Sequence, residues 1–171
     1  FYNKVNDMIV SRCITNCNIV FGKIYSYFNV DNAVTKGIET EFNANVTEQL
    51  TFNFNHTYLD TENKATGKAL PNRPKNTVNA KLSYEFSDWG VQSAVRFEHT
   101  GTQVIYATSG AVSNLPSYNL WHFNLSKNIM ENVKLSLNVE NIGNVRLLEK
   151  SNDFGFSERG RVFFVGINTK F

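Results

Sequence analysis

The chain has 171 residues, and its 17 Lys and Arg against 15 Asp and Glu give a formal net charge of +2. This length supports one ordinary domain with a sizeable core, and so mild a charge argues against a nucleic-acid partner, which needs clustered basic residues. No apolar run approaches the ~18 residues of a membrane-spanning helix. The opening residues FYNKVNDMIV lack the basic start and apolar centre of a signal peptide and contain no initial Met. We therefore expect a mature or excised piece of a longer product.

Apolar and polar residues alternate with a period of two along most of the chain, and helical spacing is nowhere sustained. In one segment, for example, Leu50, Phe52 and Phe54 alternate with Thr51 and Asn53. We expect strands over residues 1–12, 25–46, 50–59, 77–86, 91–106, 118–129, 133–145 and 161–171. The first of these has the weakest alternation. The pattern predicts an all-β fold with about eight antiparallel strands.

The connections between the expected strands alternate in length. Short turns are centred on Glu48, Asp88 and Glu131, and longer loops occupy residues 13–23, 60–74, 107–117 and 147–160. Outer-membrane β-barrels have this arrangement, with tight periplasmic turns at one end and long extracellular loops at the other. Strand parity then puts the carboxy-terminus on the periplasmic side.

The two faces of the expected strands favour a transmembrane β-barrel over a soluble sandwich. One face is dense in Asn, Ser, Thr, Lys and Glu, as a wet lumen requires, and the other carries Phe, Trp, Leu and Val. Aromatic residues recur near the short turns, where an interfacial girdle lies, at Phe86, Trp89 and Phe171. Sandwich strands are usually only about 5–6 residues long. A soluble sandwich or extracellular β-protein remains the alternative.

Five stretches follow one another in an order that is specific as a set: FYNKVNDMIVSR, YFNVDNAVTKGIETEF, LPNRPKNTVNAKLSYEF, LPSYNLWHFNLSKNIMENVKLSLNVENIGN and GRVFFVGINTKF. The second matches the pattern N-V-x-x-A-x-x-x-G-x-E at Asn29, Val30, Ala33, Gly37 and Glu39. The third matches L-x-x-x-P-K-H-T-x-N at Leu70, Pro74, Lys75, Thr77 and Asn79, with Asn76 where His is common. Together they resemble the carboxy-terminal part of TonB-dependent outer-membrane receptors, the siderophore transporters, and within them the catecholate-siderophore and colicin receptors. The run from Asn141 to Asn144 departs from the family's usual N-L-F-D.

The resemblance implies that residues 1–171 are the last third of a barrel of about 22 strands, without the plug domain and the TonB box. It implies uptake of a ferric siderophore or similar metal chelate, driven by energy from the inner membrane. The implied partners are outer-membrane lipid, the receptor's own plug domain, TonB, the ferric siderophore and the barrel-assembly machinery, for which Phe171 is the recognition signal. No nucleic acid, enzyme activity or cofactor is implied.

The resemblance also suggests which residues meet the ligand. At the extracellular mouth, Arg and Lys attract an anionic iron chelate and aromatic rings stack on its catechols. The loop residues expected to do so are Lys68, Arg73, Tyr106 and Arg159. The alternative is that they are ordinary solvated loop residues. Polar-face charges such as Arg96 and Glu98 either hold a plug through salt bridges or face a solvated lumen.

The remaining reactive residues do not indicate a metal or catalytic site. Cys13 and Cys17 lie in one expected outside loop, where an oxidising envelope favours a disulfide over two free thiols. His56, His99 and His122 fall on different strands, with no ligand at metal-binding spacing. A self-contained small barrel with an adhesion or structural role remains the second hypothesis, because eight strands can close alone.

Overall fold

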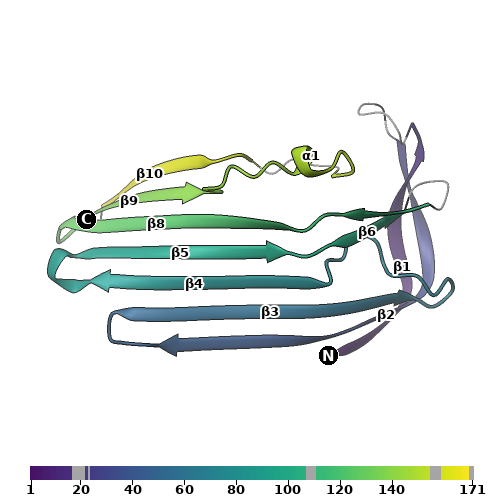
Figure 1. Cartoon of the computed structure of the whole chain (residues 1–171), viewed down its shortest axis with the longest axis horizontal. Coiled ribbons are helices and arrows are strands. Elements are labelled where there is room, and N and C mark those ends of the chain that lie inside the picture. Colours follow the sequence, from purple (N-terminus) through teal and green to yellow (C-terminus); the bar gives the residue numbers. More distant parts are fainter. Residues whose placement is uncertain (17–21, 23, 107–110, 155–158, 170–171) are drawn as a thin grey trace. The chain divides into compact units, whose positions relative to one another are not determined.

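The computed structural model describes residues 1–16, 22, 24–106, 111–154 and 159–169. Within these residues the chain is almost entirely β-structure (Figure 1), and no helix among them is long and apolar enough to cross a membrane. The strands are β1 (Tyr2–Thr15), β2 (Ile24–Asn45), β3 (Leu50–Asn63), β4 (Asn76–Phe86), β5 (Val91–Thr100), β6 (Gln103–Tyr106), β7 (Val112–Leu115), β8 (Tyr118–Met130), β9 (Val133–Glu140) and β10 (Val162–Thr169). Two short helical turns are η1 (Ser87–Trp89) and α1 (Leu147–Lys150).

Eight of these strands form one sheet by hydrogen bonding, in the order β1-β2-β3-β4-β5-β8-β9-β10, and β6 pairs with β7 in a separate two-stranded sheet. The pairs with a resolved register are antiparallel. The predicted all-β antiparallel fold is therefore confirmed. The chain divides into two compact units: unit 1 is Phe1–Glu39, Thr57–Asn76 and Gly101–Pro116, and unit 2 is Thr40–His56, Thr77–Thr100 and Ser117–Phe171.

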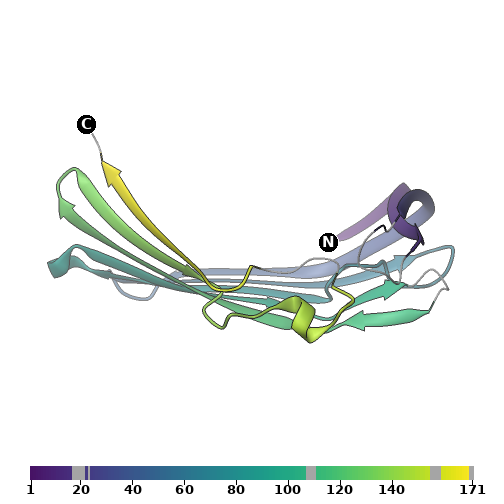
Figure 2. The same cartoon turned by 90° about the horizontal axis from the view of Figure 1, so that it is seen from above.

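Unit 2 contains a layer of strands (Figure 2), and the pairing register places chemically distinct residues on its two faces. One row of directly paired residues crosses five strands and is apolar throughout: Leu82, Val95, Phe123, Val139 and Phe163. The neighbouring row is mostly small or polar: Ser83, Ala94, Asn124, Asn138 and Phe164. Since successive side chains of a strand point to opposite faces, these rows lie on opposite sides of the layer.

The apolar face of unit 2 is exposed. In β10, Phe163, Val165 and Ile167 are 63%, 80% and 71% exposed, and Trp121 in β8 is 48% exposed. Large apolar side chains so exposed along several adjacent strands mark a surface that meets something other than water. The row pattern agrees with the predicted lipid-facing side.

Short turns join the strands of unit 2 at one end. The Thr47 hydroxyl accepts hydrogen bonds from the backbone N–H groups of Gln49 and Leu50, which closes the turn between β2 and β3. Between β4 and β5, η1 ends at Gly90, which has φ 59 and donates its N–H to the Ser87 carbonyl at 3.3 Å. Glycine adopts this left-handed conformation without steric cost, so the turn stays tight. Phe86 and Trp89, two of the aromatic residues noted near the short turns, stack there with ring centroids 5.8 Å apart.

Two predicted strands are too long in comparison with the structure. The segment 91–106 is not one strand, because β5 ends at Thr100 and β6 begins at Gln103 in the other sheet. At the break, the Gly101 N–H bonds the Asn76 carbonyl at 2.7 Å. The segment 133–145 ends at Glu140, because Asn141 and Asn144 adopt φ 50 and 51, which a strand excludes.

All four predicted long loops contain regular structure that the sequence pattern did not indicate. In the loops 13–23 and 60–74, β1 continues to Thr15 and β3 to Asn63, so Cys13 lies in a strand and not in a loop. The loop 107–117 includes β7, and the loop 147–160 includes α1. Leu147 in α1 and Phe154 shortly after it are buried, and the Phe154 ring meets the ring of Tyr118 in β8 edge to face at 6.0 Å. This connection between β9 and β10 therefore packs against β8.

Gly37, one of the family-pattern residues, is a site where unit 1 allows no side chain. A Cβ there would overlap the Tyr58 carbonyl oxygen and lie 2.9 Å from the Phe1 ring. We expect Gly37→Ala to lower the free energy of unfolding of the full-length protein by about 1–3 kcal/mol, the usual cost of overpacking. The measurement is the fraction of compact protein on unboiled gels after stepwise heating.

Gly143→Ala is the matched control for this substitution. A Cβ at residue 143 meets only Val145 Cγ2, at an ordinary 3.6 Å. Equal heat resistance of the two variants would contradict the packing derived for Gly37.

Candidate functional site

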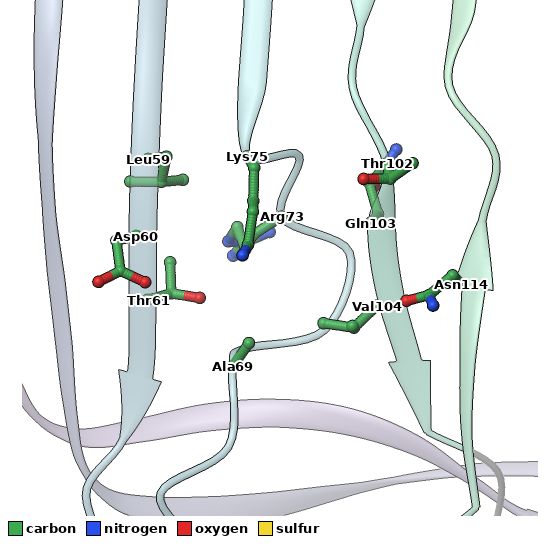
Figure 3. Close-up of a pocket in the computed structure, with 10 residues that line it drawn as sticks. All are labelled: Leu59, Asp60, Thr61, Ala69, Arg73, Lys75, Thr102, Gln103, Val104 and Asn114. Atoms are coloured by element: carbon green, nitrogen blue, oxygen red, sulfur yellow. The ribbon is translucent and has the colours of Figure 1, made fainter.

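A pocket of about 240 Å³ lies within unit 1, between the end of β3, the segment 69–75 and the β6–β7 sheet (Figure 3). Its lining residues are Leu59, Asp60, Thr61, Ala69, Arg73, Lys75, Thr102, Gln103, Val104 and Asn114. They come from four segments of the chain: 59–61, 69–75, 102–104 and residue 114. The pocket combines charged groups, neutral hydrogen-bond donors and some apolar surface.

Backbone hydrogen bonds fix the segment that carries the pocket's cations. The Leu70 N–H bonds the Thr61 hydroxyl oxygen at 3.0 Å, and Leu70 itself is only 2% exposed. The Asn72 N–H bonds the Val104 carbonyl at 3.0 Å, and the Lys75 carbonyl accepts the Leu59 N–H at 2.8 Å. Asn72 has φ 56, a conformation that Asn tolerates better than most residues. The segment is thus tied to β3 on one side and to β6 on the other.

Tyr106 at the end of β6 adds a side-chain tie to this segment. Its hydroxyl donates to the Ala69 carbonyl at 2.8 Å, and the Lys68 ammonium lies 5.6 Å from the centre of its ring. A cation at this distance over an aromatic face is attracted to it. Tyr106 and Lys68 therefore already interact with the loop and with each other.

The charges around the pocket do not balance. Its one lining carboxylate, Asp60, forms an ion pair with Lys36 at 3.3 Å. Near the end of β3, Glu62 accepts a hydrogen bond at 2.6 Å from the ammonium of Lys64, which lies just beyond the strand, and this bond raises the pKa of Lys64. Arg73 and Lys75 have no ion pair with any described residue, and Figure 3 shows both side chains projecting into the pocket. The pocket therefore presents two positive charges that no carboxylate of the described chain neutralises.

Of the four predicted ligand residues, the structure brings three into one region. Arg73 lines the pocket, while Lys68 and Tyr106 lie against the loop that frames it. Arg159 belongs to unit 2, where its backbone carbonyl accepts a hydrogen bond from the Asn141 side-chain amide at 2.8 Å. Cys13 is disulfide-bonded, but its predicted partner Cys17 lies outside the described residues, as does Phe171. The Cys13–Cys17 pairing and the role of Phe171 stay predictions.

The pocket also contains residues that the sequence analysis did not select as ligand contacts, chiefly Lys75, Gln103 and Asn114. Lys75 belongs to the L-x-x-x-P-K-H-T-x-N pattern, which does not indicate a place in a pocket. Gln103 and Asn114 belong to the small β6–β7 sheet, and no local pattern could reveal that this sheet would form. A pairing prediction for residues 103–106 and 112–115 would have been the necessary signal.

A second polar cluster lies on the polar face of unit 2. Arg96 forms an ion pair with Glu98, and the Glu98 carboxylate lies 3.7 Å from His122 Nε2. The His122 side chain is 13% exposed, and neither ring nitrogen has a hydrogen-bond partner among the described residues. No group of three or more His, Cys, Asp or Glu in the described residues could hold a metal ion.

Comparison with known proteins gives a consistent family assignment. The model of the β-barrel of TonB-dependent receptor-like proteins matches residues 1–142. The chain is similar to the ferrienterobactin receptor of Escherichia coli K12, at 26% identity over 90% of this chain and 24% of that protein. It spans about a quarter of the length of such relatives.

Solved structures share the fold. The siderophore receptor PirA from Acinetobacter baumannii has a TM-score of 0.77 and 20% identity, over 99% of this chain and 28% of that one. The copper transporter OprC also has a TM-score of 0.77, at 19% identity, over 99% of this chain and 28% of its own. A protein named as a siderophore receptor and one named as a copper transporter thus share this fold.

Tyr106→Phe tests whether the tyrosine hydroxyl holds the pocket loop. The substitution keeps the ring beneath Lys68 but removes the hydrogen bond to Ala69, which contributes about 1 kcal/mol. We expect the backbone amides of Leu70 and Asn72 to exchange with deuterium about fivefold faster. Mass spectrometry of peptides from the full-length protein measures this exchange.

The control for this prediction is Tyr27→Phe, since Tyr27 is also in unit 1 and is 79% exposed. We expect it to leave exchange of the 69–75 segment unchanged. Unchanged exchange in the Tyr106 variant as well would mean that the loop is held without the hydroxyl.

Proposed function

We propose that this chain, which belongs to the TonB-dependent receptor-like β-barrel family, is the carboxy-terminal barrel portion of a bacterial outer-membrane receptor that takes up a ferric siderophore. The observation that carries the proposal is the exposed apolar face of unit 2 opposite a polar face. Lipid covers such a face, and closure of the whole barrel pairs every backbone group. A plug domain and a TonB box precede this portion in the complete receptor.

The proposed cargo is an anionic ferric chelate, most simply a catecholate. Two relatives are named ferrienterobactin and ferric enterobactin receptors, which supports this class. The uncompensated charges of Arg73 and Lys75 favour an anion. A similar metal chelate is the broader form of the proposal, since a copper transporter has the same fold.

Lys68, Arg73, Tyr106 and Arg159 are proposed to lie at the extracellular mouth of the receptor. Their contributions differ. Arg73 offers a planar guanidinium with no carboxylate partner among the described residues, so it can pair directly with an anion. Tyr106 and Lys68 interact with the loop and with each other, so they act by holding it.

The proposed partners follow from the family. TonB supplies energy from the inner membrane, the plug domain closes the barrel, and the barrel-assembly machinery recognises the terminal Phe171. No reaction is catalysed, because transport moves the chelate without changing its bonds. A self-contained small barrel with a structural role has less support, because the relatives are about four times as long as this chain.

The proposal is tested with the complete gene in a bacterial strain that lacks its own ferric-siderophore receptors. Under iron limitation, we expect the gene to restore growth on a ferric catecholate, and only when TonB is present. The purified receptor should also bind the ferric chelate in detergent. The control is a receptor lacking the TonB box, which should bind the chelate but not restore growth. No binding of any ferric chelate, with the receptor folded in the outer membrane, would contradict the proposal.

A further inference from the structure

The pocket of unit 1 has the chemistry of an oxyanion site. Arg73 and Lys75 project into it, and the one lining carboxylate, Asp60, is engaged by Lys36 at 3.3 Å. Arg73 donates to the neighbouring Asn72 carbonyl at 3.3 Å, which leaves most of the donors on its guanidinium free. An ammonium and a guanidinium in one small pocket repel each other unless an anion lies between them.

Neutral hydrogen-bond donors line the pocket beside the two cations. The amides of Gln103 and Asn114 and the hydroxyl of Thr102 line the side of the pocket opposite β3. The Thr61 oxygen already accepts the Leu70 N–H, so its own O–H can be donated to a ligand. Together these groups supply donors in several directions, which suits a group with two or three equivalent oxygens.

The size of the pocket restricts what can enter. Its volume is about 240 Å³, below the ~300–1,000 Å³ that is usual for drug-sized ligands. A whole ferric siderophore does not fit, but one acidic group on a short arm does. Leu59, Ala69 and Val104 add apolar surface to the lining that such an arm can contact.

We infer that this pocket is a subsite for a single oxyanion group, a carboxylate or a phosphate, held between Arg73 and Lys75. The guanidinium pairs with two of its oxygens side by side, and the ammonium adds a point charge. The group can come from a pendant arm of the transported chelate or from the phosphate of a lipid headgroup. If the group belongs to the transported chelate, the inference rests on the proposed function and identifies the part of the chelate that binds in the pocket.

The loop bonds described above preorganise this subsite. Arg73 and Lys75 lie on a segment whose backbone is bonded to both β3 and β6, so little order has to be gained on binding. The inference therefore includes a positioning role for Tyr106, whose hydroxyl bonds the start of that segment at Ala69.

The experiment uses the full-length receptor in detergent, in a buffer free of phosphate and carboxylates. Inorganic phosphate is titrated by calorimetry into wild-type receptor and into Lys75→Met and Arg73→Lys variants. We expect about tenfold weaker binding for Lys75→Met, and a smaller loss for Arg73→Lys, which keeps the charge but not the planar fork. Lys150→Met, on the exposed part of α1, is the matched control and should bind phosphate as the wild type does. Compact migration on unboiled gels verifies that each variant is folded.

Two further arms identify the source of the group. One compares a ferric chelate bearing a free carboxylate with its methyl ester, and the other adds a lipid with a phosphate headgroup to the micelle. A preference for the free acid that is lost in Lys75→Met assigns the subsite to the chelate. Competition between the lipid and inorganic phosphate assigns it to lipid.

The outcomes separate this inference from the proposed function. If the wild type binds no phosphate, or if Lys75→Met and Arg73→Lys bind it as well as the wild type, the subsite does not exist, whatever the chelate data. If phosphate binding depends on Lys75 but no ferric chelate binds anywhere, the subsite stands and the proposed function fails.

Discussion

This structure depends on one constraint: where water is absent, a polypeptide must pair every backbone hydrogen-bonding group within the protein. In hydrocarbon, an unpaired N–H or C=O costs several kcal/mol, so only helices and closed sheets cross a membrane. The strands of this chain pair along long antiparallel registers, twelve positions between β1 and β2 and ten between β5 and β8. Once the backbone is paired, the side chains decide which face meets lipid. In unit 2 the apolar rows lie on one face and the polar rows on the other.

The same constraint explains where a binding site can form. Within a regular sheet, the strands are extended and paired with their neighbours, so the backbone cannot curve around a pocket. Where pairing changes partners, as it does between β5 and β6 at Gly101, the chain can leave the sheet and bring loop residues together. The pocket of unit 1 lies beyond such a change. Its cations are held by backbone hydrogen bonds to β3 and β6, so the strands position the site although they supply few of its charges.

The sequence was informative about what is local and much less so about what is not. Period-two alternation is a local property, so the strands, the short turns and the chemical difference between faces could be predicted. The ends of β5 and β9 could not, because left-handed Asn141 and the close approach of Gly101 to Asn76 depend on tertiary contacts. The pocket brings together residues as far apart in the chain as Leu59 and Asn114, so Arg73 could be selected for its charge but Gln103 and Asn114 could not. The sequence likewise could not show that Tyr106 holds the loop and is not free to stack on a ligand, because its hydrogen bond to Ala69 depends on where the fold places Ala69.

The central claim is that lipid covers the apolar face of these strands and water the polar face, and β10 offers the most direct measurement. Single cysteines at residues 163 to 168 of the full-length receptor are spin-labelled in lipid vesicles, and their collisions with oxygen and with a water-soluble nickel chelate are compared. The account predicts that labels at 163, 165 and 167 collide mainly with oxygen, which concentrates in lipid, and that labels at 164, 166 and 168 collide mainly with nickel. Equal exposure of both sets to nickel, or no alternation between neighbours, would contradict it.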